Sequence, residues 1–265
     1  MTSSLFAVAS RCVSARHAAR SFALALACGA APLTTAGAQG ENSGKGFLFG
    51  APSGGITVRA GYAGANAGSD IFSFTTSELT LNRRDFSSVG WGADLDFSLT
   101  PRVALRFTGD FSGMAKRSEF REWVDNDGMP IEQSTTFGRT SLSAGLKWFL
   151  APNGRELGRL AWVPPRYVPF VGVGVGRMWY EFKQEGDFID FDDNNRVFYD
   201  KYVSTNWAST AHVVAGFDWS LNQRWALTTQ TKYEWANAEL SRDFTGFQRI
   251  DLSGFAATAG LHLRF

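Results

Sequence analysis

The feature that most constrains the fold of this chain is the alternation of apolar and polar side chains with a period of two. The C-terminal stretch shows it most completely, because every second position is apolar: Phe255, Ala257, Ala259, Leu261, Leu263 and Phe265. Side chains of a β-strand point alternately to its two faces, so the pattern predicts strands with one apolar and one polar face. No sustained helical period follows residue 33.

Eight segments carry this pattern, and the connections between them differ strongly in length. The expected strands cover 55–63, 87–99, 102–113, 136–149, 166–182, 205–220, 224–236 and 251–265. Short turns lie near Pro101 and Asn222, and a proline-containing link spans 150–165. The other connections, 64–86, 114–135, 183–204 and 237–250, are long and polar. An up-and-down meander with this order has short turns at one rim and long loops at the other, as transmembrane barrels do.

The polar face of these strands decides between a soluble and a membrane barrel. It holds Asp94, Asp96, Arg106, Asp110, Lys147, His212, Asp218, Lys232, Glu234, His262 and Arg264. Eight strands leave an interior that side chains just fill. A polar interior and an apolar exterior are consistent if the exterior meets lipid. We therefore predict an all-β fold, an eight-stranded antiparallel up-and-down transmembrane β-barrel over 55–265. The alternative is a soluble β-sandwich with charged outer faces.

Aromatic side chains support the membrane interpretation, because they gather near both ends of the expected strands. Trp148, Tyr167, Trp219, Trp225 and Phe265 fall near the short turns, and Trp179, Trp207, Tyr233 and Trp235 fall toward the long loops. Two girdles of amphipathic rings are expected at the two membrane interfaces.

The first 38 residues are typical of a secretory signal peptide. Arg11, Arg16 and Arg20 precede an alanine-rich apolar run from 22 to 33, and the small-residue sequence Ala36-Gly37-Ala38 follows. We expect cleavage after Ala38, which leaves 39–54 as a short periplasmic segment. A lipoprotein signal that ends at Cys28 is the rival interpretation. Both cysteines, Cys12 and Cys28, lie in this leader, so we expect no disulfide in the mature chain.

Charge and motifs exclude several classes of function. The formal net charge is +1, and loss of the three leader arginines leaves about −2, so nothing favours nucleic-acid binding. We expect no cofactor and no metal ion. The acidic run 190–195 is interpreted as solvated loop charge, with weak binding of a divalent cation as the alternative. Outer-membrane lipases and deacylases need a serine, a histidine and an orienting polar partner close together. The deacylases carry a His-x-Ser strand, but here the position two residues after the histidine is Val214 for His212 and Arg264 for His262. We therefore expect no catalytic residues.

Two stretches resemble the small outer-membrane β-barrels of the outer membrane protein A and X type. One is the terminal Leu261-His262-Leu263-Arg264-Phe265, and the other is the proline-aromatic-valine-glycine strand at 167–176. In that family the barrel assembly machinery reads a C-terminal aromatic residue, so the resemblance implies that Phe265 is an assembly signal. It also implies localisation in the outer membrane of a Gram-negative bacterium, after export through the periplasm, with outer-membrane lipid around the barrel. The resemblance does not imply peptidoglycan binding, because no second domain follows the barrel.

We predict that the lumen is closed by ion pairs among Asp94, Asp96, Arg106, Asp110, His212, Lys232 and Glu234. On the two strands joined near Pro101, the even-numbered residues face inward. Inward residues therefore lie opposite each other only if the two residue numbers add up to an even value. A sum of 202 sets Asp96 opposite Arg106, and a sum of 200 sets Asp94 there. Similar reasoning brings His212 toward Lys232, with Glu234 and Asp218 able to balance the charge. An unpaired charge in a narrow interior is costly, so pairing is expected.

These expectations favour a structural or surface-interaction protein that displays the loops 64–86, 114–135, 183–204 and 237–250 to an extracellular ligand. A small channel or transporter of hydrophobic compounds is the alternative, and it requires an apolar lumen with a lateral opening. A lipid-modifying enzyme is the third possibility. The charged lumen favours the first class over the second, and the missing catalytic constellation argues against the third.

Overall fold

The computed structural model describes residues 50–125, 127–157, 161–190 and 196–265. The expected signal peptide, 1–38, and most of the segment 39–54 lie outside the described residues. The acidic run 190–195 also lies outside them, apart from Asp190. The cleavage site after Ala38 and the rival signal at Cys28 therefore stay predictions.

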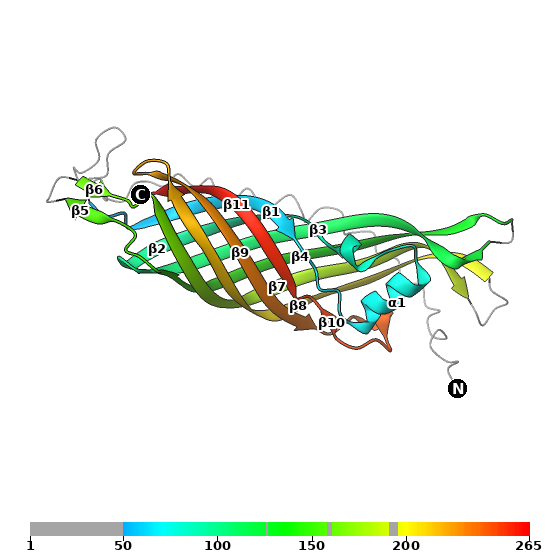
Figure 1. Cartoon of the computed structure of the whole chain (residues 1–265). Coiled ribbons are helices and arrows are strands. Elements are labelled where there is room, and N and C mark those ends of the chain that lie inside the picture. Colours follow the sequence, from blue (N-terminus) through cyan, green and yellow to red (C-terminus); the bar gives the residue numbers. More distant parts are fainter. Residues whose placement is uncertain (1–49, 126, 158–160, 191–195) are drawn as a thin grey trace, which may run out of the picture.

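Eight long antiparallel strands close into a ring, which confirms the predicted fold class (Figure 1). They are β1 Gly54–Ala63, β2 Ser88–Thr100, β3 Val103–Val124, β4 Pro130–Phe149, β7 Tyr167–Asp190, β8 Arg196–Ser220, β9 Trp225–Ala238 and β11 Gly254–Arg264. Each strand pairs with its sequence neighbour, and β11 pairs with β1 to complete the barrel. A closed ring satisfies the backbone hydrogen bonds between strands that lipid cannot satisfy.

Three shorter strands lie at the two ends of this ring. The strands β5 Arg155–Leu157 and β6 Ala161–Val163 form a separate two-stranded sheet at the end where the chain terminates (Figure 1). At the opposite end, β10 Ile250–Asp251 pairs with the last residues of β9. The proline-containing link 150–165 therefore holds a pair of short antiparallel strands.

Four strands are much longer than the sequence predicts. The segments 114–135 and 183–204, expected to be loops, consist mainly of β3 and β4 and of β7 and β8. Their outer face is polar, for example at Glu119 and Glu132, which lie opposite each other in register. A strand outside lipid needs no apolar outer face, so its alternation is weaker and the prediction of loops was wrong there.

The expected loops 64–86 and 237–250 contain helices instead of only irregular chain. They form α1 Asp70–Glu78 and the single 3-10 turns η1 Arg83–Phe86 and η2 Arg242–Phe244. Nine residues are too short to show a helical period against a β background, which explains why the sequence gave no sign of α1. Among the described residues, no helix is long and apolar enough to cross a bilayer.

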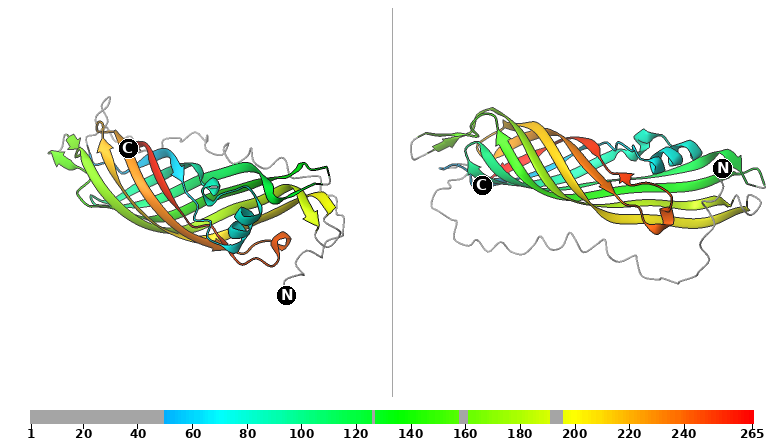
Figure 2. Two further views of the ribbon diagram at one scale, coloured as in Figure 1. Left: turned by 45° about the vertical axis from the view of Figure 1, so that its right-hand side comes forward. Right: turned by 90° about the horizontal axis from the view of Figure 1, so that it is seen from below.

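These helices cover the inner face of the projecting strands and make a second hydrophobic core. Phe72 of α1 packs edge-on against Phe86, Phe137 and Phe182, with ring centroids 4.7, 5.3 and 5.7 Å away. Leu79 forms a β-bridge with Phe120, and the Thr80 amide donates to the Glu119 carbonyl at 2.9 Å. We call the projecting parts of β3, β4, β7 and β8, together with α1, η1 and η2, the head. Figure 2 shows it extending from one end of the barrel.

Candidate functional site

The outer surface of the barrel is apolar over a continuous belt. Side chains that point outward remain exposed although they are apolar, as at Val58 (61% exposed), Leu142 (63%) and Val175 (67%). Water would penalise such a surface, whereas lipid would not. The chain is a transmembrane β-barrel. An apolar exterior around a polar interior is the architecture of outer-membrane barrels.

Two aromatic rims bound this belt. In register, Tyr167 lies opposite Trp219 near the short turns, and Trp179 lies opposite Trp207 near the head. The twelve residue-to-residue steps from Tyr167 to Trp179 span roughly 40 Å along the strand. At the usual tilt of such barrels this corresponds to a height of about 28–33 Å, close to the hydrocarbon thickness of a bilayer. The head therefore begins where the membrane ends.

In the half of the lumen near the short turns, acidic and basic side chains form bonded pairs. Arg106 lies opposite Asp96, so the register has the sum of 202. The Arg106 Nε and Nη2 atoms donate to the two Asp96 carboxylate oxygens at 2.6 and 2.8 Å. Lys147 Nζ donates to Asp218 at 2.8 Å and lies 4.0 Å from the centre of the Phe170 ring. These charges are buried and partnered.

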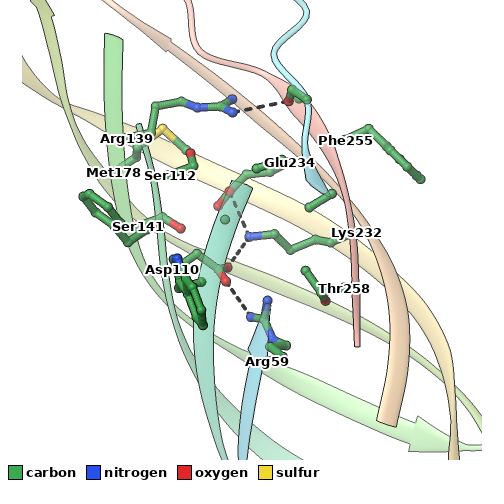
Figure 3. Close-up of a pocket in the computed structure, with 17 residues that line it drawn as sticks. Arg59, Asp110, Ser112, Arg139, Ser141, Met178, Lys232, Glu234, Phe255 and Thr258 are labelled. Atoms are coloured by element: carbon green, nitrogen blue, oxygen red, sulfur yellow. Dashed lines mark hydrogen bonds and ion pairs between the residues drawn. The ribbon is translucent and has the colours of Figure 1, made fainter. Parts of the chain in front are cut away.

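The half of the lumen nearer the head holds a second charge cluster (Figure 3). Arg59 donates to Asp94 at 2.9 Å and forms an ion pair with Asp110 at 2.6 Å. Lys232 Nζ bridges Asp110 at 2.6 Å and Glu234 at 2.9 Å. The five side chains come from β1, β2, β3 and β9, so this cluster joins strands that are distant in the sequence.

His212 is buried in the lumen, as the sequence predicts, but its register differs by two residues from one that sets it directly opposite Lys232. It is opposite Glu234 in register, whereas the residue opposite Lys232 is Val214. Within the described chain, His212 Nδ1 has no hydrogen-bond partner, and no hydrogen bond links the ring to Lys232. His212 does approach Lys232, because the charge of Lys232 acts on the ring, but the residue directly opposite His212 is Glu234. In the observed register the numbers of two paired residues add up to 446, whereas a direct pair of His212 and Lys232 would require 444. The geometry of the turn 221–224 sets this register, and the alternation pattern does not reveal it.

Sequence reasoning left several lumen residues out of the predicted network. Arg59 is the main omission: it alternates with Val58 and lies at an inward position of β1, so the period-two pattern contained the signal. Lys147 and Asp218 were assigned to the polar face but not to the network. Gln230 accepts a bond from Arg106 at 3.1 Å, and a neutral amide gives no charge signal in the sequence.

Between the charge clusters and the head, the buried Arg139 bonds to chain segments on another side of the barrel. It donates to the Leu252 carbonyl at 3.0 Å and to the Gly64 carbonyl at 3.3 Å. A cavity of about 50 Å³ remains beside it, lined on the inside by Arg59, Asp110, Lys232 and Glu234 and at the barrel wall by Trp91 and Phe255 (Figure 3). The volume corresponds to a few water molecules, not to a passage for a solute.

The tip of the β3–β4 hairpin exposes three apolar side chains that are close together in the sequence. Val124 and Met129 are each 61% exposed and Trp123 is 37% exposed. The turn between them is well bonded: the Met129 amide donates to the Asp125 carboxylate at 2.7 Å, and Gly128 adopts a positive φ of 76°. Across the described residues, no group of three His, Cys, Asp or Glu side chains has an arrangement suited to a metal ion.

Phe265, the predicted assembly signal, ends the chain on the outer face of the short-turn rim. Its ring is 46% exposed, and its amide and carbonyl bond to Gly54 at 3.0 and 3.1 Å. The last residue is thus fixed against the first strand, with its ring at the edge of the apolar belt.

No protein-family model matches the chain, and no curated protein matches it in sequence. In solved structures it is similar to neisserial surface protein A, with 11% identity, a TM-score of 0.43, and 82% of this chain and 99% of that chain covered. It is also similar to outer membrane protein OprG from Pseudomonas aeruginosa, with 11% identity, a TM-score of 0.45, and coverage of 82% and 98%. A third similar structure is E. coli outer membrane protein W, with 14% identity, a TM-score of 0.37, and coverage of 81% and 99%. At these identities the likeness is restricted to the fold.

Proposed function

We propose that this protein is an outer-membrane anchor that presents its head outside the cell to a protein partner, while its lumen stays closed. The observation that carries the proposal is the head itself. Four strands continue beyond the lipid belt and fold over a core of their own. A channel needs only short connections at its mouth, whereas a binding protein needs a rigid surface in front of the membrane.

The tip of the β3–β4 hairpin is the part of this surface best suited to a partner. Trp123, Val124 and Met129 offer apolar contacts, and Glu122 and Glu132 are exposed on either side of them. Aromatic residues and methionine are enriched in protein interfaces, and acidic residues at a rim favour a basic partner surface. We infer a partner with an apolar pocket bordered by lysine or arginine.

Capture of partners by purified, folded protein tests this role. The triple variant Trp123→Ser, Val124→Ser, Met129→Ser removes the apolar tip, and Tyr199→Ser removes an exposed ring on the neighbouring hairpin as a control. We expect a defined set of proteins to be captured by the wild type and the control and to be lost with the triple variant. Equal capture by all three proteins would contradict the proposed tip.

Closure of the lumen is tested by recordings in planar bilayers. If buried ion pairs and Arg139 close the lumen as we propose, the purified protein should give no steady conductance. Long-lived open channels of uniform size would instead support the second candidate function, a small channel or a transporter of hydrophobic compounds. One observation favours that candidate: the cavity reaches the barrel wall between Trp91 and Phe255.

A further inference from the structure

Two arginines lie opposite each other at the short-turn rim, and no salt bridge joins either of them to an acidic group in the described chain. Arg224 and Arg264 lie opposite across β9 and β11, next to the registered pair Trp225 and Leu263, and the Arg264 amide donates to the Arg224 carbonyl at 2.8 Å. Like charges that are directly opposite across a strand pair destabilise it. A bound anion would therefore stabilise this pair by offsetting the repulsion between the two guanidinium groups.

Three donor nitrogen atoms of this pair have no acceptor in the described chain. Arg264 is only 1% exposed, yet its Nε and Nη1 atoms have no hydrogen-bond partner in the described chain, and the same holds for Arg224 Nε. Arg264 Nη2 donates to Ser220 Oγ at 2.9 Å. Asp218 is the acidic group whose charge acts on Arg264, but its two oxygens already accept from Lys147 and Thr228 at 2.8 and 2.7 Å. Buried guanidinium donors without acceptors are costly.

A tryptophan covers the guanidinium group of Arg264. The Arg264 guanidinium carbon lies 5.6 Å from the centre of the Trp162 ring, which is 3% exposed. Trp162 lies in β6. Among the described strands, β5 and β6 pair only with each other and not with a strand of the barrel. A two-stranded hairpin alone is only marginally stable, so this cover is displaceable. Gly154 is required beneath the ring, because a Cβ atom there would overlap it.

We propose that Arg264 and Arg224 form a binding site for a phosphate-type oxyanion at the periplasmic mouth of the barrel, and that Trp162 occupies this site when it is empty. Guanidinium groups bind phosphate oxygens through paired N–H donors, which are the groups left without acceptors here. The bound oxyanion supplies the missing negative charge. Its source is either free phosphate or the headgroup of an anionic phospholipid.

Titration calorimetry with inorganic phosphate, on folded protein in an uncharged detergent, tests this site. We expect the wild type to bind phosphate. Trp162→Ala should bind it about two- to fivefold more tightly, since the competing cation–π contact is lost. Arg264→Gln and Arg224→Gln should each lose at least about tenfold in affinity, the worth of one charge-assisted hydrogen bond. Arg102→Gln, which alters an exposed arginine of another short turn, should bind as the wild type does.

Heat-modifiable gel migration shows which variants are folded, and Arg224→Gln serves if Arg264→Gln does not fold. Absence of phosphate binding by both the wild type and Trp162→Ala would overturn the proposal, and so would unchanged binding by both arginine variants. Repeating the titration in phosphatidylcholine nanodiscs with and without phosphatidylglycerol separates the two sources. Weaker phosphate binding with phosphatidylglycerol identifies the lipid headgroup as the occupant, and equal binding identifies free phosphate.

Discussion

Arg106 shows how a single side chain joins several others in the lumen. Its guanidinium group donates twice to Asp96 and once to Gln230, and it lies 5.2 Å from the centre of the Phe170 ring. Removal of one partner from a buried pair leaves the other charge uncompensated. We expect Arg106→Ala to lower the free energy of unfolding by about 3–5 kcal/mol.

Urea unfolding in detergent measures this loss, and a double-mutant cycle with Asp96→Ala isolates the pair. The double variant should lose less than the sum of the two single variants, because no lone charge remains. A loss below about 1 kcal/mol for Arg106→Ala would show that water solvates the lumen.

Phe265 is the second residue with a distinct expected effect. Its ring lies at the edge of the belt, where it adds little to the packing of the barrel. We propose that deletion of Phe265 reduces the amount of assembled protein in cells, because the assembly machinery no longer recognises the last strand. Folding of the purified chain into detergent should persist. Normal assembly in cells without Phe265 would refute this role.

At the scale of elements, helix α1 holds the head together through Phe72. This ring is fully buried among three others, whereas Phe74 of the same helix is 42% exposed and packs on Phe247. Phe72→Ala should destabilise the head by about 3–5 kcal/mol. Limited trypsin digestion should then cut near Arg83 and Arg84 while the barrel stays intact. Phe74→Ala is the matched control and should resist cleavage like the wild type.

The β7–β8 hairpin gives the head a dependence on alkaline pH. Burial, reinforced by the charge of Asp200, raises the pKa of Tyr202 to about 12. Its ring packs edge-on against Phe188 at 4.7 Å, in the part of β8 that lies outside the membrane. Because the folded-state pKa is raised, the stabilisation is complete below the unfolded-state pKa near 10 and is lost as the pH rises toward 12.

Thermal unfolding of the head between pH 9 and 12 measures this effect. Tyr202→Phe keeps the ring contacts but cannot ionise, so its stability should decline less steeply over this range. Identical pH profiles for the wild type and Tyr202→Phe would show that the phenol does not contribute.

At the scale of the whole molecule, ring closure should make the protein resistant to detergent. The strands of the barrel leave no free edge within the membrane belt, so unfolding must break the ring as a unit. We expect unboiled samples to migrate differently from boiled samples in detergent gels. The same migration before and after boiling would argue strongly against a closed barrel.

The sequence alone determined the barrel, because lipid imposes a strict rule on every strand that crosses it. Where outward positions meet lipid and inward positions meet the lumen, side chains alternate without interruption, as from Leu261 to Phe265. The charges of the lumen could be assigned for the same reason. Even the opposition of Asp96 and Arg106 was one of only two options, since the turn near Pro101 is short.

Only the tertiary structure decided what lies beyond the belt. In the head, water on one side and a small core on the other replace lipid, so strands such as 114–124 lose the alternation, and α1 is too short to show a period. The partners of Lys232 and the orphaned donors of Arg264 depend on which strands meet across the lumen. Some of those contacts join residues more than a hundred positions apart, and others depend on a strand register that is set by turn geometry. A local sequence pattern contains no information on long-range contacts or on the geometry of turns.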